Sequence, residues 1–161
     1  MWPLCAAAVV AAGCAHEGRA GAERDLELGS RQVRVSAPAG WELLDQGAVK
    51  RFRKGESQIA LQNLGPAAAP VDLAAWGRAA LADDDERRAL KSSRAVTVDS
   101  QEAVEVETWS RLDHAWPQRF LFVRIDDDVV ALHTPGRADD DVVKAFDAIR
   151  DSLHFPSSAR R

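Results

Sequence analysis

Hydrophobic and polar residues alternate along several short runs of the chain, which is the pattern of strands with one buried face. The runs lie at residues 32–38, 49–53, 58–64, 95–98, 103–109, 119–125 and 129–133. Lys54, Gly55 and Glu56 separate the second run from the third, which predicts a hairpin. The triplet 126–128 is all aspartate, a residue that tolerates turn geometry, and it predicts a turn between the last two runs.

Two segments carry hydrophobic residues at helical spacing instead. In the first, Asp72 is placed to cap a helix whose apolar positions are Leu73, Trp76, Ala80 and Leu81. The second segment starts with three aspartates at residues 139–141, which suit the positive end of a helix dipole. Its apolar positions fall on one helical face and are Val142, Ala145, Phe146, Ile149 and Leu153. The order of elements predicts an α+β fold, mainly antiparallel, with helices flanking the sheet.

Composition limits the function classes. The chain has 161 residues, of which 46% are hydrophobic, and this is ordinary for a single domain with a core. Its formal net charge of −4 argues against nucleic acid as a partner, because nucleic-acid binders carry a basic excess. After the first residues, no apolar run approaches the roughly 20 residues that span a bilayer. Any membrane attachment is therefore expected to come from the N-terminus.

The N-terminal segment carries the most specific functional signal in the sequence. Residues 4–13 form an apolar stretch of secretory-signal length, and they end in Ala11, Ala12 and Gly13 before Cys14. This run resembles a bacterial lipobox. The resemblance implies cleavage between Gly13 and Cys14 and acylation of the Cys14 sulfur and amine, so that the partner of this end is the lipid bilayer. The expected location is the cell envelope, facing the periplasm or the outside.

These observations divide the chain into four parts. We expect a lipoprotein-type signal peptide at residues 1–13, a flexible tether at 14–30, one folded domain at 31–156 and a disordered tail at 157–161. Ala15 follows the cysteine directly, which is similar to lipoproteins that are forwarded to an outer membrane where the cell has one. The folded domain contains no cysteine, because Cys5 and Cys14 are the only two.

Two short signatures connect the domain to a known superfamily. Residues 38–41 read Pro-Ala-Gly-Trp after an early strand, and residues 146–155 read FDAIRDSLHF. With the order of elements, these signatures resemble the PsbP-like superfamily, including bacterial envelope proteins of the DcrB type. The resemblance covers residues 32–155 and implies an α/β/α sandwich around a mainly antiparallel sheet. Members are mostly binding or assembly factors, and the resemblance implies no catalytic residues.

Three acidic clusters, at residues 83–86, 126–128 and 139–141, are weak candidates for metal sites. None has the spacing of an EF-hand loop, and the histidines of the domain show no zinc-binding spacing. We therefore predict no metal or cofactor. Ser110, Asp113 and His114 are near one another in sequence and keep a small hydrolase open as an alternative. A carrier with an apolar pocket between sheet and helix is a second alternative.

Trp109 and Trp116 bracket a predicted loop and are candidate partner-binding residues, because tryptophan is enriched at interface hot spots. We expect both to pack in the core; if exposed, they would be anchors for a partner. The basic cluster at residues 50–54 contains Phe52 and is interpreted as a charged guard on an exposed strand edge. The sequence thus predicts a lipid-anchored, non-enzymatic binding or assembly factor with an envelope protein as its partner.

Overall fold

The computed structural model describes residues 21–66, 72–82, 88–110 and 116–156. These residues form nine strands and two helices. The strands are β1 (Arg24–Leu28), β2 (Arg31–Val35), β3 (Glu42–Gln46), β4 (Val49–Lys54), β5 (Ser57–Pro66), β6 (Arg88–Val98), β7 (Gln101–Ser110), β8 (Pro117–Ile125) and β9 (Asp128–His133). The helices are α1 (Leu73–Ala82) and α2 (Asp140–Ser152).

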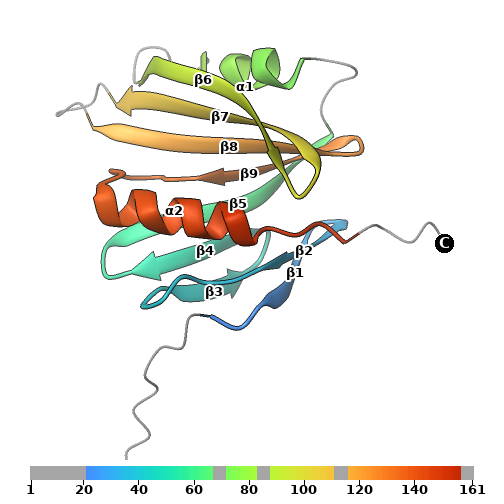
Figure 1. Ribbon diagram of the computed structural model, residues 1–161, viewed down its shortest axis with the longest axis vertical. Helices are drawn as coiled ribbons and strands as arrows, with labels where there is room; N and C mark the ends of the chain where they lie inside the picture. The colour runs from blue at the N-terminus through green and yellow to red at the C-terminus, as the bar shows by residue number, and fades with distance from the viewer. Residues whose placement is uncertain (1–20, 67–71, 83–87, 111–115, 157–161) are drawn as a thin grey trace, which may run out of the picture.

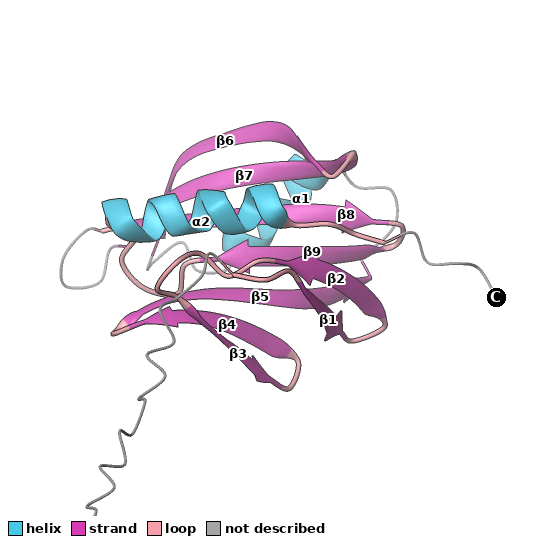
Figure 2. Cartoon of the chain, turned by 60° about the horizontal axis from the view of Figure 1, so that its bottom comes forward, coloured by secondary structure: helices cyan, strands magenta, loops and turns pink. Residues whose placement is uncertain are grey.

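Seven of the strands form one antiparallel sheet in the order β3-β4-β5-β9-β8-β7-β6, so that β3 and β6 are its edges. The strands β1 and β2 form a separate antiparallel hairpin. This hairpin and α2 lie on one face of the sheet, and α1 lies on the other (Figures 1 and 2). The result is the expected α+β fold in three layers. We call the two faces the α2 side and the α1 side.

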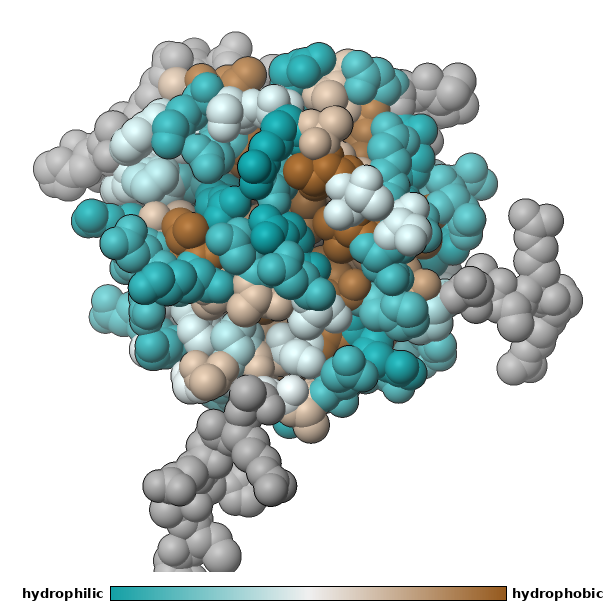
Figure 3. Space-filling model, in the orientation of Figure 1, coloured by the Kyte–Doolittle hydropathy of each residue, from teal (hydrophilic) through white to brown (hydrophobic). Residues whose placement is uncertain are grey.

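The larger core lies on the α2 side. Helix α2 is capped by Asp139, whose carboxylate accepts a hydrogen bond from the N–H of Val142 at 3.1 Å. Its apolar face is buried as the periodicity predicted, and it packs with the hairpin against alternate residues of the sheet. From outside, hydrophilic residues cover most of this side, with hydrophobic residues gathered in a band among them (Figure 3).

The α1 side holds a smaller core. Asp72 caps α1 as expected, because its carboxylate accepts a hydrogen bond from the N–H of Ala74 at 2.9 Å. Gly77 lets the helix approach the sheet closely, since a Cβ there would lie 3.0 Å from Phe122 Cδ2. Trp76 meets the edge of the Phe122 ring at 5.3 Å between centroids. Helix α1 therefore packs against β7 and β8, and it also contacts β6.

The predicted tether is wrong in its second half. Residues 24–28 form β1, and Leu26 and Leu28 are buried. Leu26 pairs with Val33 across the hairpin, so the alternation of two leucines with Glu27 is that of a strand with one buried face. The folded domain thus starts before residue 31. The first predicted run corresponds to β2, which ends at Val35.

The other predicted strands are confirmed, with different lengths. The hairpin around Gly55 is formed by β4 and β5, and the Asp126–Asp127 turn joins β8 to β9. The run at residues 95–98 is the end of the much longer β6. Among the described residues, no helix is long and apolar enough to cross a membrane.

Candidate functional site

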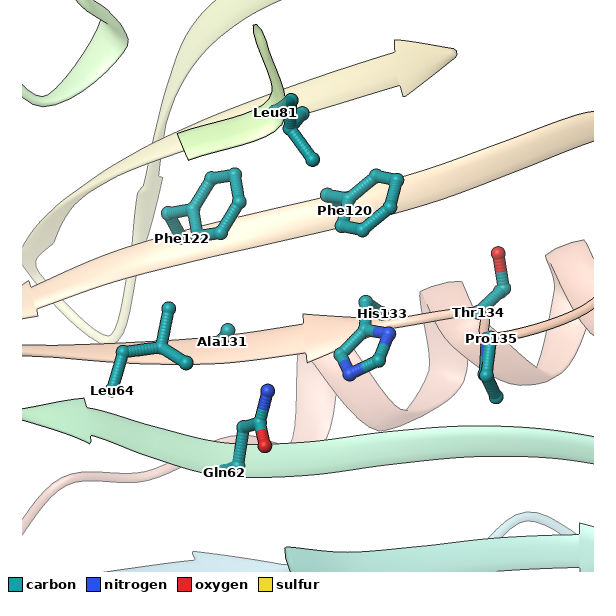
Figure 4. Close-up of a pocket in the computed structure, with 9 residues that line it drawn as sticks. All are labelled: Gln62, Leu64, Leu81, Phe120, Phe122, Ala131, His133, Thr134 and Pro135. Carbon is teal, nitrogen blue, oxygen red and sulfur yellow. The ribbon is translucent and has the colours of Figure 1, made fainter. Parts of the chain in front are cut away.

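A hollow opens on the α1 side of the sheet, beside the C-terminal end of α1. Its volume is about 300 Å³. The residues that line it come from β5, β8, β9, α1 and the segment after β9: Gln62, Leu64, Leu81, Phe120, Phe122, Ala131, His133, Thr134 and Pro135. Figure 4 shows them arranged around one depression over the three central strands. We call this feature the sheet hollow.

The hollow exists because small residues lie between large ones. Helix α1 packs over β6, β7 and β8, and its contact with the sheet ends near Leu81. Next to that point, β9 presents Ala131, which pairs with Phe122 on one side and Gln62 on the other. A methyl side chain between two long ones leaves space above it. Ala131 is therefore the floor of the hollow, and the space above it is the hollow itself. Leu64 stands at its margin and is 41% exposed.

Aromatic rings form one wall of the sheet hollow. The rings of Phe120 and Phe122 are stacked at 6.1 Å with an interplanar angle of 15°. The His133 ring continues this row, 5.7 Å from Phe120 and nearly parallel to it at 6°. The opposite wall is polar, because Gln62 projects from β5 toward the same space (Figure 4). An apolar hollow with few polar groups is the common form of a ligand-binding site.

The basic cluster on β4 does not protect a sheet edge, because β4 lies between β3 and β5. Three of its four cations have carboxylate partners. Lys50 is buried against Asp45 on β3, Arg53 binds Glu42 at 2.9 Å and Lys54 binds Asp141 of α2 at 2.6 Å. Phe52 is fully buried in the core.

Arg51 is different from these three neighbours. It is exposed, and its cross-strand neighbour on β3 is Leu44, where Arg53 has Glu42 and Lys50 has Asp45. No carboxylate among the described residues is in ion-pair contact with Arg51. On the other side it pairs with Ala60, which in turn pairs with His133. Arg51 and His133 therefore lie in one row across the α1 side of the sheet, separated by a single methyl group.

We expected Trp109 to pack in the core, and this expectation is wrong. It is 37% exposed, and Lys91 lies over its ring with Nζ 5.5 Å from the centroid. Trp116 is partly buried, and its indole nitrogen has no hydrogen-bond partner among the described residues. The N–H of Ser110 donates to the carbonyl of Trp116 at 2.9 Å, so the two tryptophans flank one end of the β7–β8 hairpin.

Of the three residues that kept a small hydrolase open as an alternative, the structure describes only one. Ser110 is buried, whereas Asp113 and His114 lie outside the described residues. No group of three or more His, Cys, Asp or Glu side chains with the geometry of a metal site is found in the described ranges. The lipidation residues Gly13 and Cys14, the tail at 157–161 and the acidic cluster at 83–86 also fall outside them.

The two described acidic clusters serve the fold. Arg31 of β2 binds Asp126 at 2.6 Å and Asp128 at 2.7 Å, which fastens the β1–β2 hairpin to the β8–β9 turn. These contacts raise the pKa of the Arg31 guanidinium above its ordinary value, with the Asp128 hydrogen bond as the main cause. In the third cluster, Asp139 caps α2 and Asp141 binds Lys54.

A buried carboxylate joins α2 to the sheet. Glu105 of β7 accepts hydrogen bonds from Arg150 of α2 at 2.6 Å and from Arg94 of β6 at 2.5 Å, and Arg119 lies 3.6 Å away. Burial alone would raise the pKa of Glu105, but the hydrogen bonds from Arg150 and Arg94 outweigh it and lower that pKa. Arg119 also lies over the Phe146 ring at 4.9 Å. The cluster holds the two layers together.

Sequence reasoning did not identify the sheet hollow. The lining residues come from segments that are far apart in sequence, and they meet only through the strand order β5-β9-β8. The available signal was local: Ala60 and Ala131 are small residues at positions where neighbouring alternate residues are large. Arg51 was noticed only as part of a basic cluster, because its lack of a partner depends on the pairing of β3 with β4.

Comparisons with known proteins identify the fold of the domain but not its family. No family model matches the chain, and no curated protein matches it. A solved structure does match: the solution structure of cyanobacterial PsbP (CyanoP) from Synechocystis sp. PCC 6803. The TM-score is 0.61 and the identity 16%, over 88% of this chain and 96% of that chain. The domain therefore has a PsbP-like fold, as the two signatures implied.

Proposed function

We propose that this chain is a lipid-anchored protein of the bacterial cell envelope that acts as a non-enzymatic binding or assembly factor. In this proposal, Cys14 carries the acyl chains and the PsbP-like domain recognises another envelope protein. Two or three acyl chains give a stable anchor, because each buried methylene contributes about 0.8 kcal/mol. The anchor confines the domain to the membrane surface, where the partner is encountered.

The observation that carries the binding role is the exposure of Trp109. It is one of three large hydrophobic residues that are exposed in the described part of the chain, with Leu64 and Leu90. Tryptophan contributes strongly at interfaces because it combines a large apolar area with few rotatable bonds. Lys91 above the ring restrains its orientation before a partner arrives. We call the surface formed by Trp109 and Lys91 the Trp109 surface.

A photo-activatable amino acid at position 109 of the full-length chain tests this role. The matched control carries the same amino acid at Gln58, which is also exposed on a strand but lies on the opposite face of the sheet. We expect irradiation of intact cells to give one reproducible protein adduct from position 109 and not from position 58. Equal or absent adducts at the two positions would contradict a partner-binding role for the Trp109 surface.

A second candidate function is the carriage of a small, mainly apolar ligand. The sheet hollow favours it, because the hollow combines an aromatic wall, an exposed leucine and a few polar groups. The two candidates use opposite faces of the sheet. A ligand that shifts NMR signals of Phe120 and His133 without affecting the adduct from position 109 would support both roles independently.

A further inference from the structure

The sheet hollow lies beside an unbalanced positive charge. Of the four cations on β4, three are matched by carboxylates from β3 or α2, and the register places Leu44 where Arg51 would find one. Arg51 is also two strands away from His133, which lines the hollow. Neighbouring strands are about 4.8 Å apart, so the backbone of Arg51 lies about 10 Å from that of His133, and an extended arginine side chain can cover most of this distance.

From this arrangement we infer that the sheet hollow binds a short aliphatic carboxylate. The hydrocarbon chain lies against Leu64, Leu81 and the Phe120 ring, and the carboxylate lies at the open side, where the Arg51 guanidinium binds it. Guanidinium and carboxylate form paired, charge-assisted hydrogen bonds, so this residue distinguishes an acid from a neutral molecule of the same length. Gln62 supplies a polar contact near the head group, and the His133 ring lines the same hollow.

The size of the hollow limits the ligand. A volume of about 300 Å³ is at the small end of ligand sites, and it suits a chain of medium length better than a long acyl chain. Leu64 lies at one end of the lining residues (Figure 4), so the apolar part of the hollow is short. Affinity should thus increase with each added methylene, by about fourfold, and stop increasing once the hollow is full.

This inference rests on the second candidate function and not on the Trp109 surface. The test uses the full-length chain with Cys14→Ser, which is free of acyl chains and detergent. Binding of hexanoate, octanoate, decanoate and the neutral analogue octanol is measured by calorimetry, and NMR signals of Gln62 and His133 report the location. We expect octanoate to bind at least tenfold more tightly than octanol, with shifts at both reporters.

Two variants assign the head-group contact. Arg51→Gln should weaken octanoate binding about tenfold and leave octanol binding unchanged. Arg53→Gln is the matched control, because Arg53 lies on the same strand and face but is paired with Glu42, and it should change neither. Both variants keep Phe52 and the strand pairing, so folding is preserved and is checked from the NMR spectrum.

Three results would overturn the inference. Equal binding of octanoate and octanol, unchanged by Arg51→Gln, would leave an apolar carrier without carboxylate recognition. Octanoate binding without shifts at Gln62 and His133 would place the ligand elsewhere. Binding of N-acetyl-Leu-Phe with a free carboxylate, and of none of the fatty acids, would assign the hollow to the C-terminus of a partner polypeptide.

Discussion

Asp99 Oδ2 accepts a hydrogen bond from the backbone N–H of Phe155 at 2.7 Å, across 56 positions of sequence. The same oxygen lies 2.9 Å from Nδ1 of His154, whose backbone pairs with Arg34 of β2. Asp99 sits in the turn between β6 and β7 with a φ of 48°, a conformation that aspartate tolerates. The Asp99 side chain thus fastens the segment after α2 to the β6–β7 turn. Phe155, in that segment, is buried.

Asp99→Asn should lower the free energy of unfolding by about 1 kcal/mol at neutral pH, because a neutral acceptor replaces a charged one. The hydrogen bond from Phe155, aided by the one from His154, lowers the pKa of Asp99 in the folded state. Its contribution is therefore complete above the unfolded pKa of about 3.9 and is lost as the pH falls through the folded pKa. Urea unfolding at pH 7 and pH 3 measures the difference.

The control for this variant is Asp127→Asn, in the β8–β9 turn. Asp127 is exposed, and the substitution should change stability by less than about 0.5 kcal/mol at either pH. An Asp99→Asn protein whose deficit is as large at pH 3 as at pH 7 would show that the carboxylate charge does not hold the segment in place.

Glu105→Gln should destabilise the domain by about 3 kcal/mol, because Arg150 and Arg119 would keep their charges in a partly buried site without the carboxylate. The matched control is Glu107→Gln, on the same strand and face. Its pair with Lys91 is 3.0 Å long but much more accessible to solvent than the pairs of Glu105, so the loss should be below about 1 kcal/mol. Denaturant unfolding of both variants at neutral pH separates the two cases, and equal losses would contradict a special role for the buried cluster.

The pH dependence of the Glu105 cluster follows from the direction of its pKa. The folded-state pKa is lowered, so the stabilisation is complete above the unfolded value of about 4.3 and disappears on further acidification. The stability difference between the parent chain and Glu105→Gln should therefore be constant from pH 5.5 to pH 7 and shrink below about pH 4. A difference that grows on acidification would contradict the assignment.

Gly77→Leu should separate α1 from the sheet, because even a Cβ at this position lies 3.0 Å from Phe122 and 3.4 Å from Val104. Overpacking of this kind costs about 1–3 kcal/mol, and the melting temperature should fall accordingly. Arg78→Leu, at the next and exposed position, should be nearly neutral. Similar melting temperatures for the two variants would show that the helix does not need its close approach at Gly77.

Much of the fold could be predicted because the strands and helices have clear periodicities. The apolar stripe on α2 and the aspartates at its N-terminal end are local features, and the structure has both. The strand β1 was missed because it contains only Leu26 and Leu28 among charged residues, and its burial depends on the hairpin packing beside α2 on one face of the sheet. Two leucines in a polar segment carry too weak a pattern to distinguish a strand from a tether.

The candidate sites depend on relationships that a single segment does not contain. Trp109 has the same parity along β7 as Glu105 and Glu107, so the alternation indicated the more polar face of that strand. The expectation that Trp109 is buried was based on its residue type, whereas its position on the strand indicated exposure. The hollow depends on more distant pairings: Ala131 becomes the neighbour of Gln62 and Phe122, and Ala60 that of His133, only once β9 is inserted between β5 and β8.

Cys14→Ser should release the chain from membranes, because the proposed acylation starts at the sulfur of this residue and the acyl chains are the proposed anchor. The matched control is Cys5→Ser, which alters the other cysteine of the leader and should leave membrane association intact. Fractionation of cells and intact-mass measurement of the membrane-bound form test this, with a lipid-sized mass increase expected for the parent chain and for Cys5→Ser. Membrane association that survives Cys14→Ser, without any lipid mass on the parent, would contradict the anchor and leave the binding roles of the domain to be judged on their own tests.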